Sequence, residues 1–161
     1  MSFRDLELSL PDEAATGRLA TAVAAALPTD ITGWSLLLQG ELGAGKSTFA
    51  RAMIRHLGHE GPVPSPTYTL VEPYDLPRGV LYHVDLYRVS DAEELDYLGW
   101  SDWQDALLLL EWPERAMQVR DNADLLVALD YEGRGRMARL SALSGRAAVL
   151  VETVHKAWVS F

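Results

Sequence analysis

The stretch "SLLLQGELGAGKSTFARAMIRHLG", residues 35–58, decides the fold. Residues 34–38, which are apolar apart from Ser35, predict a strand buried on both faces, because polar residues do not alternate with apolar ones. Residues 40–47 then match the pattern G-x-x-x-x-G-K-[ST], and residues 47–56 have helical spacing. A buried strand, a glycine-rich loop and a helix in this order predict a phosphate-binding loop.

Each residue type in this loop has a physical reason. The three glycines allow backbone angles at which successive N–H groups turn toward an anion, and the following helix adds the positive end of its dipole. Lys46 supplies a charge for the outer phosphates, and Ser47 supplies a hydroxyl for a magnesium ion that bridges them. An ordinary glycine-rich turn explains the glycines but not Lys46 and Ser47. We therefore expect a nucleoside triphosphate to contact Gly40, Glu41, Leu42, Gly43, Ala44, Gly45, Lys46, Ser47 and Thr48.

A phosphate-binding loop needs a carboxylate on the metal side, at the tip of a neighbouring strand. Glu111 follows four leucines, and Asp85 ends the run "VLYHVD". Spacing alone does not separate their roles. Glu111 is favoured for magnesium because its strand is the more apolar, and Asp85 is then expected to orient the attacking water or to hold a metal-bound water. His83 is interpreted as a hydrogen-bonded sheet histidine rather than a catalytic one, since phosphoryl transfer needs little acid–base help.

The rest of the chain predicts an α/β fold. Helices are expected at residues 12–27 and, capped by Ser90 and Glu93, up to Gly99. Strands are expected at residues 3–8, 68–72, 80–85, 106–111, 125–131 and 136–143, of which 68–72 and 80–85 form an antiparallel hairpin with its turn at 75–79. Residues 147–158 fit either a helix or a strand. The prediction is one P-loop NTPase-like domain, residues 1–161, with a mixed parallel and antiparallel sheet flanked by helices.

Composition limits the function. The 161 residues include 14 Lys and Arg against 23 Asp and Glu, a net charge of −9, which disfavours stand-alone binding of DNA or RNA. The chain has no cysteine, and neither a signal peptide nor a membrane-spanning run is evident, so a cytoplasmic protein is expected. The single asparagine, Asn122, leaves no N-K-x-D motif for guanine, which favours ATP over GTP.

Five segments occur together in a known order: "GELGAGKSTF", "SPTYTLVEPY", "YHVDLYR", "EELDYLGW" and "LLEWPER". In order and approximate spacing they resemble the bacterial ATPase component, of TsaE type, of tRNA threonylcarbamoyladenosine biosynthesis. The likeness runs from about Leu10 to Leu143. This family usually has threonine where Ser47 stands, which keeps the hydroxyl.

The resemblance implies a weak ATPase that becomes useful when it docks on TsaB and TsaD, which modify adenosine 37 of tRNA, so that tRNA is met only indirectly. It implies Lys46 on the phosphates, Ser47 and Glu111 on magnesium, and Asp85 beside the reacting phosphate. Thr67 resembles a switch residue that senses the γ-phosphate. The resemblance also implies that Trp112, next to Glu111, reports or supports nucleotide binding. Asp12, Thr16 and Arg136 are implied near the base and ribose.

Two other classes of function fit a short P-loop chain. One is a small-molecule kinase, although no arginine-rich lid is evident in the sequence. The other is a nucleotide-dependent binding module without turnover, in which ATP sets the shape of the S-P-T-Y-T loop. Candidates for an arginine that neutralises transition-state charge are Arg78, Arg88 and Arg136, and a partner protein is a further source.

Overall fold

The computed structural model describes residues 5–91 and 93–160. Seven strands form one sheet: β1 (Asp5–Leu10), β2 (Ser35–Gln39), β3 (Val71–Leu76), β4 (Gly79–Asp85), β5 (Leu107–Glu111), β6 (Leu125–Glu132) and β7 (Gly135–Ala142). Their spatial order is β1-β7-β6-β2-β5-β4-β3. The four central strands β6, β2, β5 and β4 are parallel, whereas β1, β7 and β3 pair antiparallel with their neighbours. The predicted mixed sheet is confirmed.

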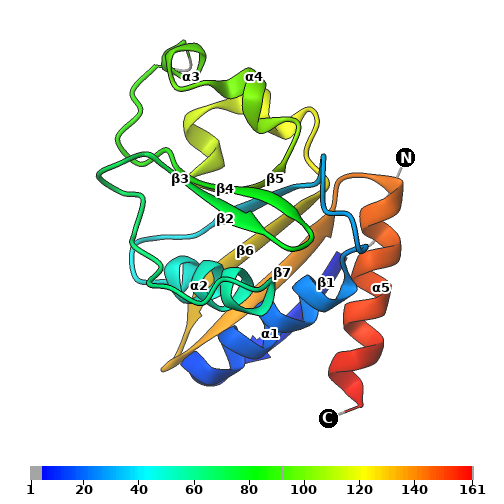
Figure 1. The fold of residues 1–161 in the computed structure, drawn as a ribbon. Coiled ribbons are helices and arrows are strands. Elements are labelled where there is room, and N and C mark those ends of the chain that lie inside the picture. The colour runs from blue at the N-terminus through cyan, green and yellow to red at the C-terminus, as the bar shows by residue number, and fades with distance from the viewer. Residues whose placement is uncertain (1–4, 92, 161) are drawn as a thin grey trace.

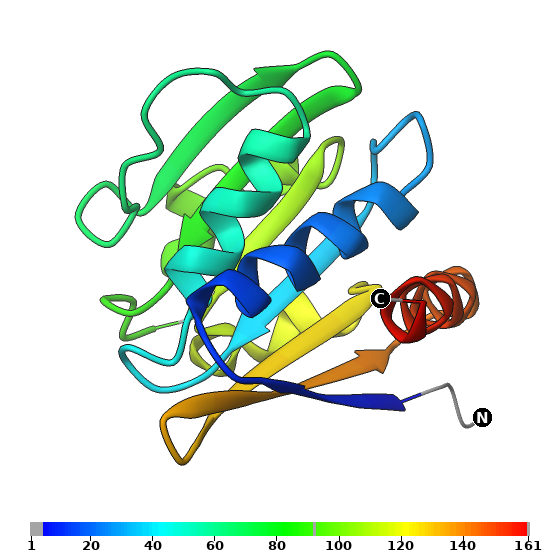
Figure 2. The same ribbon diagram turned by 90° about the horizontal axis from the view of Figure 1, so that it is seen from below.

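The helices are α1 (Glu13–Ala26), α2 (Lys46–His56), α3 (Glu94–Tyr97), α4 (Trp100–Trp103) and α5 (Gly145–Val159), with two 3-10 turns, η1 (Pro113–Arg115) and η2 (Met117–Arg120). Figures 1 and 2 show α1, α2 and α5 on one face of the sheet, while α3 and α4 lie on the other. Helix α1 packs against both α2 and α5. The sheet is therefore the middle layer of a sandwich.

Strand β2 shows why the apolar run has no alternation. Leu36 and Leu38 belong to the core under α1, α2 and α5, whereas Leu37 belongs to the core on the opposite face. All three side chains are fully buried. Adjacent residues of a strand point to opposite faces, so the part of a strand that is covered on both sides is apolar at consecutive positions, here Leu36 to Leu38.

The predicted hairpin is confirmed, but its first strand begins later in the sequence than predicted. Strand β3 begins at Val71 rather than residue 68, because residues 66–70 close a turn in which the Leu70 amide donates to the Pro66 carbonyl at 2.7 Å. Leu70 itself has a φ of 71°, which does not fit a strand. Pro73 is tolerated inside β3 because β3 is an edge strand.

The predicted helix before Gly99 is shorter than expected. The Ser90 hydroxyl bonds to the carboxylate of Glu94, and the carboxylate of Asp91 accepts from the amide of Glu93, so no capping box forms. Helix α3 is a single turn, and Gly99, with a φ of 89°, separates it from α4.

The elements at the two ends of the chain differ in part from those expected. The first strand, expected at residues 3–8, is described from Asp5 and runs on to Leu10, while Phe3 and Arg4 lie outside the described residues. The C-terminal segment is helical: α5 begins after Ser144, whose hydroxyl accepts from the Ala147 amide. Within the described part of the chain, no helix is long and apolar enough to cross a membrane.

Candidate functional site

The loop between β2 and α2 has the backbone of an anion-binding nest. Gly45 precedes α2 with a φ of 114°, in the left-handed region that favours glycine. Gly40 has no room for a side chain, since a Cβ there would lie 2.5 Å from the carbonyl oxygen of Leu129. The loop therefore fits tightly against β6, while Lys46, Ser47 and Thr48 from the first turn of α2 line a pocket.

Two side chains from the β6–β7 hairpin hold the outside of this loop. The Tyr131 hydroxyl donates to the Leu42 carbonyl at 2.6 Å, and the Arg136 guanidinium donates to the Gly43 carbonyl at 3.0 Å. The Arg136 guanidinium also lies over the Tyr131 ring, 4.2 Å from its centre. Two carbonyl oxygens of the loop are thus bonded on the side of the hairpin. Sequence reasoning missed Tyr131, whose contact partner lies 89 residues away.

Lys46 begins α2 and is almost fully buried. Its ammonium group donates to the carbonyls of Gly40 and Glu41 and lies 4.3 Å from the centre of the Trp112 ring. Burial lowers the pKa of Lys46, and the nearby carboxylates of Glu111 and Asp85 oppose that shift. The charge of Lys46 is therefore held inside the pocket rather than in solvent.

Asp85 and Glu111 stand opposite each other at the ends of the parallel strands β4 and β5. Both side chains are buried. The Asp85 carboxylate accepts from the Thr67 hydroxyl at 3.0 Å and from the Tyr87 amide at 2.8 Å. The Glu111 carboxylate is 2.6 Å from His83 Nε2, so His83 is a hydrogen-bonded sheet histidine, as interpreted from the sequence.

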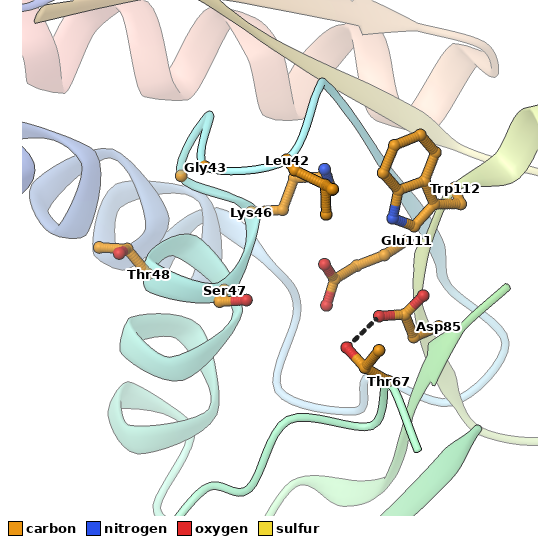
Figure 3. A pocket seen from close by; sticks show the side chains of 10 residues that line it. Leu42, Gly43, Lys46, Ser47, Thr48, Thr67, Asp85, Glu111 and Trp112 are labelled. Carbon is orange, nitrogen blue, oxygen red and sulfur yellow. Dashed lines mark hydrogen bonds between the residues drawn. The ribbon is translucent and has the colours of Figure 1, made fainter. Parts of the chain in front are cut away.

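These residues surround one pocket (Figure 3). Lys46 and Ser47 enter it from α2, Asp85 and Glu111 from the strand ends, and Thr67 from the S-P-T-Y-T loop. The Glu111 carboxylate points toward the Ser47 hydroxyl (Figure 3). The pocket is lined by Leu42, Gly43, Gly45, Lys46, Ser47, Thr48, Thr67, Asp85, Glu111 and Trp112.

Oxygen ligands at this position fit a magnesium ion. The described residues contain no cluster of three or more His, Asp or Glu side chains that could bind a metal. Mg²⁺ is commonly held by one or two protein oxygens together with phosphate oxygens and water. A hydroxyl and a carboxylate beside a phosphate-binding loop supply that kind of partial shell.

Trp112 follows Glu111 directly and has a φ of 61°, which is uncommon outside glycine. This backbone places its ring between the Lys46 ammonium and the Tyr87 ring, whose centre is 5.0 Å away. Trp112 therefore covers one side of the pocket, and its expected part in reporting or supporting nucleotide binding stays a prediction.

The residues expected near the base and ribose line a second pocket beside the loop. Asp12, Thr16 and Arg136 gather there with Gly43, Gly45 and Thr48, which the first pocket also contains. The Asp12 carboxylate caps α1 by accepting from the Ala15 amide at 2.8 Å. Of the other loop residues, Glu41 is exposed, and the Ala44 side chain is buried under the loop.

The three candidate arginines are in different settings. Arg78 donates to the carbonyls of Leu27 and Pro28 and so ties the β3–β4 turn to the segment after α1. Arg88 lies over the exposed Tyr68 ring at 4.4 Å. Arg136 braces the phosphate loop, as described above. None of the three is among the residues that line the pocket of Figure 3.

The mixed sheet and the glycine-rich loop define a P-loop NTPase-like α/β protein. A sequence model of the family "Threonylcarbamoyl adenosine biosynthesis protein TsaE" matches residues 10–139. The chain therefore belongs to the TsaE family and has a role in tRNA threonylcarbamoyladenosine biosynthesis. This confirms the resemblance inferred from the sequence motifs.

Individual relatives agree. The tRNA threonylcarbamoyladenosine biosynthesis protein TsaE of Haemophilus influenzae is 46% identical over 107 residues, which are 65% of this chain and 68% of that protein. The protein of the same name from Synechocystis is 38% identical over 74% of this chain and 77% of its own. The crystal structure of Bacillus subtilis YdiB superposes with a TM-score of 0.77 over 98% of both chains, at 23% identity, and shows the shared fold.

Proposed function

We propose that the protein binds ATP with Mg²⁺ at residues 40–48 and hydrolyses it, weakly alone and usefully when it acts on the TsaB–TsaD pair. In this proposal the pair modifies adenosine 37 of tRNA, ATP turnover resets the complex between rounds, and tRNA is contacted only through the partners. The observation that carries the proposal is the convergence of Lys46 and Ser47 from α2 with Asp85 and Glu111 from two neighbouring strand ends.

The roles follow from position and chemistry. Lys46 binds the outer phosphates, and its buried ammonium group, bonded here to the Gly40 and Glu41 carbonyls, already lies inside the pocket. Ser47 and Glu111 would hold Mg²⁺, whose charge offsets that of the phosphates. Asp85, oriented by the Thr67 hydroxyl and the Tyr87 amide, is placed to position the attacking water.

Thr67 couples the pocket to the surface loop that carries it. Its hydroxyl contacts both Asp85 and the Ser65 hydroxyl, at 3.0 Å and 2.8 Å. A γ-phosphate beside Asp85 would compete for the Thr67 hydroxyl and change the loop, which suits a switch that a partner protein reads. We place the ribose and base in the second pocket, near Asp12, Thr16 and Arg136.

Phosphate release from ATP tests the function. The protein is assayed alone, with the TsaB–TsaD pair and with candidate metabolites, and a Lys46→Ala preparation reports contaminating ATPases. We expect the TsaB–TsaD pair to stimulate phosphate release and the metabolites to have no effect. Release that depends on a metabolite would instead identify a kinase, and binding without release under any condition would identify a nucleotide-dependent binding module.

The magnesium assignment has a separate test. Glu111→Ala should weaken the Mg²⁺ dependence of ATP binding while metal-free ATP binding is retained. An unchanged Mg²⁺ dependence in this variant would remove Glu111 from the metal site.

A further inference from the structure

His83 lies beside the pocket and not in it. Residues two apart on a strand share a face, so His83 and Asp85 of β4 lie on the same side of the sheet. Asp85 pairs with Glu111 across β4 and β5, which makes His83 the diagonal neighbour of Glu111. Only 3% of either side chain, His83 or Glu111, is exposed, and Nε2 is 2.6 Å from the carboxylate oxygen Oε2.

The two ring nitrogens of His83 have different surroundings. Nδ1 is buried and has no hydrogen-bond partner among the described residues. A proton on Nδ1 would leave a buried N–H group unpaired, which is costly. Nε2 faces a carboxylate oxygen and must carry a proton for that contact to be attractive. The surroundings therefore place the proton of the contact with Glu111 on Nε2.

We propose that His83 is a positioning residue for Glu111, which fixes the carboxylate that the proposed function assigns to Mg²⁺. The Nε2–H group engages Oε2 and so leaves Oε1 as the oxygen for the metal side. The inference rests on the proposed function, because it gives Glu111 its purpose. His83 itself touches neither nucleotide nor metal.

Stability alone does not account for this histidine. Its Nδ1 is buried without a partner, which opposes folding, and a leucine would fill the same layer of β4 without that cost. What a leucine lacks is a donor for Glu111, whose carboxylate would then be free to rotate. Outer residues that orient metal ligands act in this way, and their loss typically weakens metal binding about 10- to 100-fold.

Two substitutions separate positioning from packing. In His83→Gln the amide nitrogen can take the place of Nε2, whereas in His83→Asn it corresponds to Nδ1 and cannot reach Glu111. Mn²⁺ binding is measured by electron paramagnetic resonance with a non-hydrolysable ATP analogue at saturation. We expect the Mn²⁺ dissociation constant to rise about 10-fold or more in His83→Asn and less than about 3-fold in His83→Gln.

The outcomes distinguish the inference from the proposed function. If Glu111→Ala weakens Mn²⁺ binding but His83→Asn binds as tightly as wild type, the inference is wrong and the proposed function stands. If Glu111→Ala also binds Mn²⁺ like wild type, the inference and the assignment of Glu111 to the metal are both wrong.

A measurement on the unmodified protein covers the case in which His83→Asn does not fold. Two-bond ¹H–¹⁵N correlation spectra report which ring nitrogen of His83 carries the proton. A proton on Nε2 is expected. A proton on Nδ1 alone would overturn the proposed contact with Glu111.

Discussion

The Tyr131 hydroxyl donates a hydrogen bond of 2.6 Å to the carbonyl oxygen of Leu42, which ties the end of β6 to the phosphate loop. A Cβ at Gly43 would lie 2.6 Å from the same hydroxyl, so the loop and the tyrosine fit closely. With Arg136 on the next carbonyl, the hairpin fixes two peptide groups of the loop from outside. Preorganised loop amides bind phosphate without a cost of ordering.

Tyr131→Phe should therefore weaken ATP binding. Loss of one hydrogen bond of about 1 kcal/mol corresponds to roughly a fivefold rise in the dissociation constant, measured by calorimetry. Tyr97→Phe is the matched control, because Tyr97 is 90% exposed on α3. Equal affinities for Tyr131→Phe and wild type would show that the contact does not shape the loop.

Lys46→Met should weaken ATP binding about 10- to 100-fold, the effect of a lost hydrogen bond to a charged group. The variant should nevertheless be at least as stable as wild type, because burial lowers the pKa of Lys46 and so disfavours its charged form in the folded protein. Thermal unfolding followed by circular dichroism measures this second effect.

The pH dependence of that difference has a defined sign. A lysine whose pKa is lowered on folding opposes folding while it is protonated. The free energy of unfolding of wild type should therefore increase relative to that of Lys46→Met as the pH rises from the folded pKa of Lys46 to its unfolded value. Lys156→Met, at a side chain that is 77% exposed, is the control. A Lys46→Met protein that is clearly less stable than wild type at neutral pH would contradict the claim that the buried charge of Lys46 opposes folding.

Thr67→Val tests the contact with Asp85 at nearly constant volume. Turnover should fall about 10-fold, the kinetic equivalent of one hydrogen bond to a charged group, while ATP affinity changes little. Thr67→Ser keeps the hydroxyl and should retain most of the activity. Steady-state phosphate release with the TsaB–TsaD pair and calorimetry with ATP measure the two quantities. Wild-type turnover in Thr67→Val would exclude a role for this hydroxyl.

Asp124 lies away from the site, and its hydrogen bonds lead to a prediction about stability. Its buried carboxylate accepts from the Ser35 amide, the Ser144 hydroxyl and the Arg146 guanidinium, and so joins β2 to α5. Asp124→Ala should lower the free energy of unfolding by about 2–4 kcal/mol, since it removes a buried carboxylate and leaves the part-buried Ser35 amide unpaired. Glu7→Ala breaks the exposed pair with Arg139 and should change it little. Urea unfolding of both variants would contradict this reading if their losses were equal.

Local patterns predicted those parts of the fold that depend on neighbours in sequence. The β2–loop–α2 unit was predictable because apolar run, glycines and helical spacing are contiguous, and the strand ends at Asp85 and Glu111 followed from the apolar runs before them. The start of β3 was not predictable from the sequence. Leu70 has a positive φ, and a residue other than glycine or asparagine gives no indication of such a backbone angle.

Contacts between residues far apart in the sequence could not be predicted either. Periodicity at residues 125–143 indicates two strands but not that Tyr131 would meet Leu42. The nature of α5 depended on its tertiary setting, where Ala147, Val151 and Val154 are fully buried against the rest of the core. A short apolar segment fits helix or strand until such a partner face is known.

The most direct test of the account is a crystal structure with Mg²⁺ and a non-hydrolysable ATP analogue at saturating concentration. We predict the phosphates within the amides of residues 40–47, the Lys46 ammonium on the outer phosphates, and Mg²⁺ between Ser47 and Glu111. Nucleotide bound elsewhere, or no nucleotide at this loop, would contradict the central claim.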